Sequence, residues 1–223
     1  TVERHDSYWA RLQSIRCKWY IAFGRYSDPQ DSWKYKMKAA HTREAVAIAL
    51  NMAYMFSSER FKTALYEFGP LHSNNDKAEI DKTALLANVL NHRGLTFGYT
   101  TGVMGLGGGT TFGMHEVCYL EHYADDKSIT ETIFHEFAHC VGYGHAGNMT
   151  YEQTGPGWIT LCNNVYVALS LDKELPVYSR RFLHTRWSRN RYFDDIYVAS
   201  KHIIEDPELD ALDGGLSPLR GET

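Results

Sequence analysis

The sequence has no apolar run that approaches the roughly 20 residues needed for a membrane-spanning helix. This excludes a transmembrane helix within its 223 residues. It also has no large excess of charge of one sign, since 23 Lys and Arg stand against 27 Asp and Glu and the formal net charge is −4. A basic footprint for nucleic acid or for an anionic membrane surface is therefore missing, and we expect no nucleic-acid partner.

Cysteine is scarce. The four cysteines are Cys17, Cys118, Cys140 and Cys162, and no two of them have the C-x-x-C spacing of a zinc ribbon. Three pairings are possible if two disulfides form, so the pairing and the redox compartment stay open. With 43% hydrophobic residues, a chain of this length can bury one substantial core, and we expect a single domain over residues 1–223.

The apolar pattern changes along the chain between the period of a strand and that of a helix. Alternation predicts a strand near 17–26, and a short apolar run predicts another at 117–120. Residues recurring at three and four positions predict helices over 38–56, 76–92 and 159–171, with further helical pieces at 177–189 and 193–204. The mixture predicts an α+β fold.

The most informative segment is the run from His135 to His145, which reads HEFAHCVGYGH. On a helix, His135 and His139 lie on one face and can present two imidazole nitrogens to one metal ion. Glu136 lies beside that pair, where it can reach a water on the metal without being a ligand. The H-E-x-x-H pattern therefore predicts a metal-assisted hydrolase with Glu136 as general base.

A third ligand, His145, cannot come from a straight continuation of this helix, because six residues beyond His139 the side chain has rotated off the metal face. Gly142 accepts positive φ at low cost, so it can end the helix and turn the chain back under the metal. Three neutral histidines leave a fourth position open, as in a catalytic rather than a closed structural zinc site.

This run matches the signature H-E-x-x-H-x-x-G-x-x-H of the metzincin zinc peptidases, so the chain resembles that family. The segment 147–151 that follows resembles the methionine turn of metzincins, with Met149 beneath the histidines. In several metzincin families a tyrosine two residues later serves as an extra ligand or oxyanion donor, and Tyr151 has that offset. Met149 follows His145 by only four residues, fewer than in most members. Core filling by Met149 and a hydrogen-bonded surface role for Tyr151 are the alternatives.

More narrowly, residues 94–162 resemble a bacterial group of zinc-dependent metalloproteinase lipoproteins. The resemblance implies a small mixed sheet with a backing helix and a zinc helix, an upper part over about 1–142, and a mainly helical lower part over about 143–212. We expect the tail 213–223 to be frayed. The resemblance to this group also implies an extracytoplasmic location and a possible lipid anchor upstream of this chain.

A glycine-rich stretch lies between Gly94 and His122, ahead of the predicted zinc helix. It lacks the G-K-[ST] ending of a phosphate-binding loop, which argues against nucleotide binding. By analogy with metzincins, an antiparallel edge strand here would pair with an extended peptide. The expected substrate rim comprises Gly107, Gly108, Gly109 and Thr110. A flexible glycine loop with no substrate role is the alternative.

Together these features predict a zinc-dependent endopeptidase with one catalytic Zn²⁺ held by three histidines and a protein or peptide substrate. Two other functions remain open at this point. One is a non-catalytic surface binding protein that retains a zinc site, and the other is a zinc amidase acting on cell-wall peptides. The oligomeric state and the cleavage specificity do not follow from these motifs.

Overall fold

The structure is a computed structural model that describes residues 9–24, 37–76, 78–119, 127–177, 200 and 203–205. The helical pieces expected at 177–189 and 193–204 lie almost entirely outside the described residues. The tail expected to be frayed, 213–223, lies wholly outside them.

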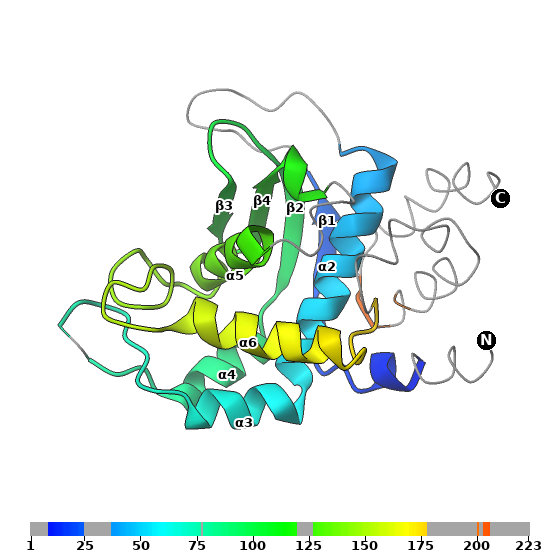
Figure 1. Cartoon of the computed structure of the whole chain (residues 1–223). Helices are drawn as coiled ribbons and strands as arrows, with labels where there is room; N and C mark the ends of the chain where they lie inside the picture. Colours follow the sequence, from blue (N-terminus) through cyan, green and yellow to red (C-terminus); the bar gives the residue numbers. More distant parts are fainter. Residues whose placement is uncertain are drawn as a thin grey trace.

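A four-stranded mixed sheet forms the upper half of the molecule (Figure 1). Its strands are β1 (Tyr20–Phe23), β2 (Gly94–Thr100), β3 (Gly105–Gly108) and β4 (Thr111–His115). The spatial order is β1-β2-β4-β3; the first three in this order run parallel, and β3 runs antiparallel to β4. The sheet and the helices together confirm the expected α+β class, and the antiparallel strand β3 is at the edge of this sheet.

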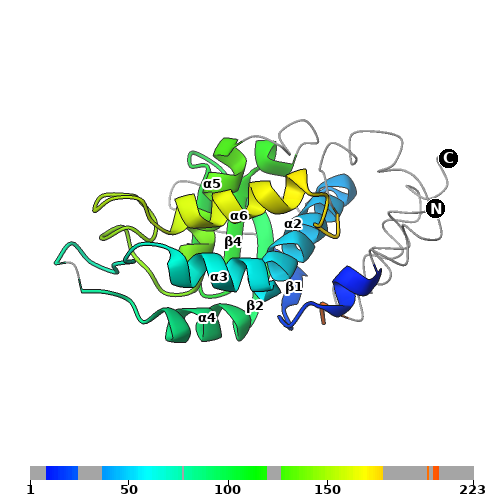
Figure 2. The ribbon, with the colours of Figure 1, turned by 60° about the horizontal axis from the view of Figure 1, so that its bottom comes forward.

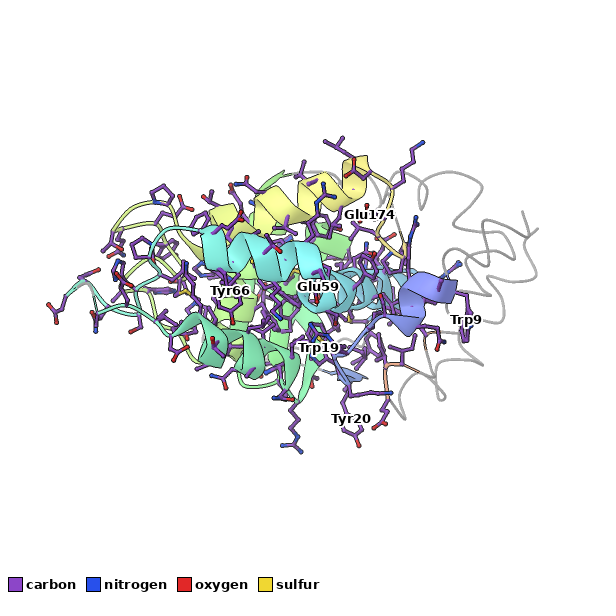
Figure 3. The ribbon with its side chains drawn as sticks, turned by 90° about the horizontal axis from the view of Figure 1, so that it is seen from below. Trp9, Trp19, Tyr20, Glu59, Tyr66 and Glu174 are labelled. Carbon is purple, nitrogen blue, oxygen red and sulfur yellow. The ribbon has the colours of Figure 1, made fainter. Side chains whose placement is uncertain are left out.

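The N-terminal strand shows the alternation expected from its sequence. Trp19 and Ile21 are fully buried, whereas Tyr20 between them is half exposed. In Figure 3, Trp19 lies within the molecule and Tyr20 points outward. The strand itself is shorter than the segment 17–26 in which it was expected.

In the part of the chain that the structure describes, the helices that pack on or below the sheet are α2 (Ala39–Ser57), α3 (Glu59–Glu67), α4 (Lys82–Leu90), α5 (Lys127–Cys140) and α6 (Trp158–Leu171). Figure 1 shows α5 in front of β3 and β4, which it contacts, and α2 beside β1. The lower helix α6 packs against both α5 and α3, as the turned view in Figure 2 shows. The helix α5 is thus held between the edge of the sheet and the lower layer.

The helices expected over 38–56 and 159–171 are confirmed almost to the residue. The expected helix 76–92 is wrong at its start, because the Asp81 side chain accepts hydrogen bonds from the backbone N–H groups of Thr83 and Ala84 and begins α4 there. The strand expected at 117–120 is also wrong. Residues Glu116–Tyr119 form a short 3₁₀ helix after β4.

An aromatic cluster fixes the position of α5. The ring of Phe56 on α2 stacks on Phe137 of α5 at 5.0 Å and on Trp158 of α6 at 5.8 Å between centroids. The indole N–H of Trp158 donates to the carbonyl of Phe134 at 3.2 Å. Because all four side chains are fully buried, these contacts lock three helices together around α5.

All four cysteines are buried free thiols, so none of the possible disulfides is present. Burial raises the pKa of Cys17 to about 11 and that of Cys140 to about 12, which keeps both thiols protonated and unreactive. Within the described ranges, no helix combines the length and the apolar character that crossing a membrane requires.

Candidate metal centre

The helix α5 presents His135 and His139 on one face, one turn apart, with Glu136 next to the first of them. The two imidazole rings lie 4.8 Å apart between centroids and nearly perpendicular, at 85°. Phe134, Phe137 and Ala138, which lie outside the histidine face of the helix, are fully buried. The core therefore fixes the rotation of α5, and this rotation turns the histidine face toward the open side.

Gly142 ends α5 in a Schellman motif. Its φ is +102°, the N–H of Gly142 donates to His139 O at 3.0 Å, and the N–H of Tyr143 donates to Ala138 O at 3.0 Å. No atom lies within 4 Å of the Cβ that a larger residue would add at Gly142, so the backbone conformation, not space, requires glycine. This turn reverses the chain and brings His145 back to the helix.

The three histidine side chains converge. The Nε2 atom of His139 lies 3.2 Å from Nε2 of His135 and 3.1 Å from Nε2 of His145. Nitrogens bound to one tetrahedral zinc ion at about 2.0–2.1 Å are about 3.3 Å apart. The three residues can therefore hold one metal ion, as their spacing in the sequence indicates.

Hydrogen bonds on the far side of two rings set their tautomers. The Nδ1 atom of His135 is 2.8 Å from Thr150 O, and that of His139 is 2.6 Å from Tyr143 O. A carbonyl can only accept, so each Nδ1 carries the proton and each Nε2 presents a lone pair when the ring is neutral. Lone pairs 3.2 Å apart repel one another, and a cation between them removes that repulsion.

Burial, followed by the mutual repulsion of the histidines, lowers the pKa of both His135 and His139. Hydrogen bonds to the backbone carbonyls oppose this shift without cancelling it. Both rings are therefore neutral near pH 7, and neutral imidazole is the form that binds a metal ion.

Glu136 is almost fully buried beside the histidines, with one carboxylate oxygen 3.9 Å from His135 Nε2. Burial raises its pKa to about 7. A cation in the site would favour the charged form, because an opposite charge lowers the pKa of a carboxyl group. The carboxylate is thus placed beside the metal position without being one of the three converging ligands.

The strand β3 packs directly on Glu136 through two glycines. A Cβ at Gly105 would lie 2.5 Å from Glu136 Oε1, and a Cβ at Gly107 would lie 3.0 Å from its Cα and closer still to its carbonyl oxygen. No atom lies within 4 Å of a Cβ at Gly108. The glycines at 105 and 107 therefore allow the strand to approach α5, a role that the glycine-rich sequence itself does not indicate.

The segment 147–151 follows the third histidine and contributes Thr150 and Tyr151 to the lining of the site. Met149 and Thr150 are fully buried, and the Thr150 hydroxyl donates to Gly144 O at 2.8 Å. The ring of Tyr151 is half exposed and lies 4.8 Å from the rings of both His135 and His145. The short link after His145 thus brings Tyr151 beside the two rings.

Asn148 anchors this segment to the rest of the protein. Its side chain accepts from His72 N at 2.7 Å and donates to Pro70 O and Pro156 O, both at 3.1 Å. Its backbone N–H donates to His72 O, and its carbonyl accepts from Trp158 N. Nothing in the metal motif indicates this role of Asn148. The sequence shows only that an asparagine directly precedes Met149.

The site opens into a cleft of about 680 Å³. The histidines and Glu136 form its floor, Gly105 and Gly107 of β3 form one wall with the half-exposed Val103 and Met104, and Tyr151 and Ile159 form the other. Of the four residues expected at the substrate rim, Gly107 lines the cleft. Gly108 ends β3, and Gly109 and Thr110 form the turn to β4.

We compared the chain with models of protein families, with curated proteins and with solved structures, and none of them matches.

Proposed function

We propose that the protein is a zinc-dependent endopeptidase of the metzincin type. The observation that carries this proposal is the convergence of three imidazole Nε2 atoms beside a buried carboxylate, on the floor of an open cleft. A purely structural zinc site is normally closed by four protein ligands. Here the described residues supply three, which leaves room for a water or a substrate oxygen.

Zinc suits this set of donors better than magnesium or calcium does. Three neutral imidazoles are typical zinc ligands, whereas magnesium and calcium prefer carboxylate, carbonyl and water oxygens. The carbonyls of Thr150 and Tyr143 orient the His135 and His139 rings from behind, as the outer partners of zinc-binding histidines do.

Bound zinc would lower the pKa of a coordinated water and polarise the carbonyl of the scissile peptide bond. Glu136 would act as general base, taking the proton of the water that attacks the scissile carbonyl and returning it to the nitrogen of the amine that leaves. Its buried position excludes competing solvent, and the glycine wall of β3 holds its carboxylate in place. Tyr151, whose ring lies 4.8 Å from the rings of His135 and His145, would donate a hydrogen bond to the developing oxyanion.

The edge strand β3 supplies the binding surface for the substrate. It pairs with β4 on one side, and its residues from Gly105 to Gly107 line the cleft. An extended peptide can add to such an edge through main-chain hydrogen bonds, which places a peptide bond above the histidines. This mode requires an unfolded or extended segment in the substrate.

The test is cleavage of a peptide library, and of denatured protein, by zinc-loaded protein with and without a chelator. We expect one equivalent of zinc by elemental analysis, cleavage that the chelator abolishes, and recovery on adding zinc. The Glu136→Gln variant should bind zinc equally but lose turnover. Bound zinc without cleavage of any peptide would contradict the proposal and favour a binding protein, and cleavage confined to cell-wall peptides would favour an amidase.

A further inference from the structure

A second, smaller pocket of about 310 Å³ opens beside the metal cleft. The two share a wall that includes Tyr151 and Ile159, and the small pocket then continues over the first two turns of α6. The part of it that lies over α6 is lined by polar residues, namely Glu152, Thr160, Asn163 and Asn164. A substrate lying over the histidines can therefore place one of its side chains in this pocket.

The polar part of the pocket contains hydrogen-bond acceptors that have no partner among the described residues. The Oε1 atom of Glu152 accepts from Gly157 N at 3.3 Å, from Thr160 N at 3.2 Å and from the Thr160 hydroxyl. These bonds fix the carboxylate at the start of α6, and its second oxygen has no protein partner among the described residues. Glu152 therefore presents a held negative charge to the pocket.

Asn163 provides an independent indication. This residue is 6% exposed, and its Oδ1 atom has no hydrogen-bond partner in the described part of the chain. A buried acceptor without a partner is costly, and a donor brought in by a ligand can remove that cost. Asn163 and Glu152 can thus each accept a hydrogen bond from a donor on a ligand.

Charge and shape agree with a long cationic side chain. No Lys or Arg lines either the cleft or the small pocket in the described ranges. Tyr151 and Ile159 at the shared wall offer apolar surface for a methylene stem, while the charged end reaches the polar residues beyond. An acidic side chain would meet the Glu152 carboxylate and be repelled.

We propose that this pocket selects a lysine or arginine side chain of the substrate next to the bond that is cleaved, with Glu152 as the specificity residue. The inference rests on the proposed peptidase function and adds the class of substrate to it. The apolar wall formed by Val103 and Met104 on the opposite side of the cleft is suited to an uncharged neighbour.

The first experiment is a positional-scanning peptide library cleaved by zinc-loaded protein. We expect lysine and arginine to be enriched at one position beside the cleaved bond. Two peptides that differ only in lysine or norleucine at that position then give kcat/KM for each variant. Because a hydrogen bond to a charged group is worth about 1.5–3 kcal/mol, Glu152→Gln should lower kcat/KM for the lysine peptide by about 10-fold to 150-fold. The norleucine peptide should change less than about twofold.

Glutamine keeps the oxygen that accepts from the start of α6, so this variant is expected to fold. Glu67→Gln, at an exposed residue of α3 that lines neither pocket, is the matched control and should behave as wild type. Asn164→Lys is a second variant, at an exposed residue of the pocket wall. This added positive charge should reduce cleavage of the lysine peptide and increase cleavage of a peptide with glutamate at the same position.

Binding separates this inference from the peptidase function. The same two peptides, labelled with a fluorophore, are titrated with zinc-loaded Glu136→Gln protein and with the Glu136→Gln, Glu152→Gln double variant. Tighter binding of the lysine peptide that disappears in the double variant supports the pocket even without turnover. Cleavage with no preference for lysine or arginine overturns the pocket and leaves the peptidase standing. If the protein neither cleaves nor binds these peptides, both the pocket and the peptidase function are overturned.

Discussion

Alanine substitutions along β3 should separate the two functions of its glycines, since each added Cβ meets a different part of Glu136. At Gly107 the added carbon would lie 3.0 Å from the Cα and the carbonyl carbon of Glu136, and closer to the carbonyl oxygen. Comfortable carbon contacts are about 3.5–4.0 Å, so the strand has to move away from α5 by on the order of 1 Å. The backbone of a buried helix cannot yield as a side chain can.

We therefore expect Gly107→Ala to lower the free energy of unfolding by about 1–3 kcal/mol, the usual cost of overpacking. At Gly105 the Cβ would meet the side chain of Glu136 instead, 2.5 Å from Oε1. A carboxylate can rotate away, so Gly105→Ala should cost less stability. Under the proposed mechanism, in which Glu136 is the general base, it should nevertheless lower kcat by about 100-fold, because displacing a catalytic group by about 1 Å costs that much.

Gly108→Ala is the matched control, because no atom lies within 4 Å of its added Cβ and its φ is not in the left-handed region. It should leave stability unchanged or raise it slightly, since alanine is less flexible than glycine in the unfolded chain. Urea unfolding followed by circular dichroism and steady-state cleavage of one peptide give the two readouts. Equal effects of alanine at 105, 107 and 108 on both would refute the packing argument.

Three further outcomes follow from the structure. Gly142→Ala should cost about 1–2 kcal/mol, measured by urea unfolding, because alanine is strained at a φ of +102°, and should weaken zinc binding in a competitive chelator titration. Asn148→Ala should lower the melting temperature, measured by calorimetry, and release zinc more readily, since three side-chain hydrogen bonds that anchor the turn before Met149 are lost. Burial lowers the pKa of His92 in the folded protein. Below about pH 6.5 the unfolded chain therefore binds more protons at this residue than the folded protein does, and the free energy of unfolding decreases as the pH falls. In the presence of a chelator, the free energy of unfolding of His92→Phe should therefore fall less between pH 7 and pH 5 than that of wild type; an identical fall in both proteins would contradict this.

The parts of the site that the sequence predicts are those set by local geometry. Helical periodicity places His135 and His139 together, and the left-handed glycine at 142 explains how a residue beyond the helix returns to it. These relations span a few residues and depend on backbone geometry alone. For the same reason α2 and α6, with their repeated apolar positions, are predicted well.

The features of the fold and of the site that the sequence does not predict depend on contacts between segments that are distant in the chain. The short helix after β4 replaces an expected strand, although its residues have strand propensity; Cys118 and Tyr119 are buried there, and the Tyr119 hydroxyl donates to Gly98 O on β2. Such a tertiary bond outweighs a local preference of a few tenths of a kcal/mol. The packing of Gly105 on Glu136 is likewise invisible in the sequence, since 31 positions separate the two residues.

The short link from His145 to Met149 can be explained by how the turn is supported. Gly147 has a φ of +78°, and a Cβ there would lie 2.8 Å from the carbonyl carbon of His72, so the link lies directly on the segment after α3. The N–H of Gly147 donates to the Asn75 side chain at 2.9 Å, and Asn148 bonds His72 in both directions. These contacts with His72 and Asn75 hold the four-residue link in place. Because Thr150 in the same turn accepts the bond from His135 Nδ1, the segment 70–76 helps to orient a candidate metal ligand that it does not touch.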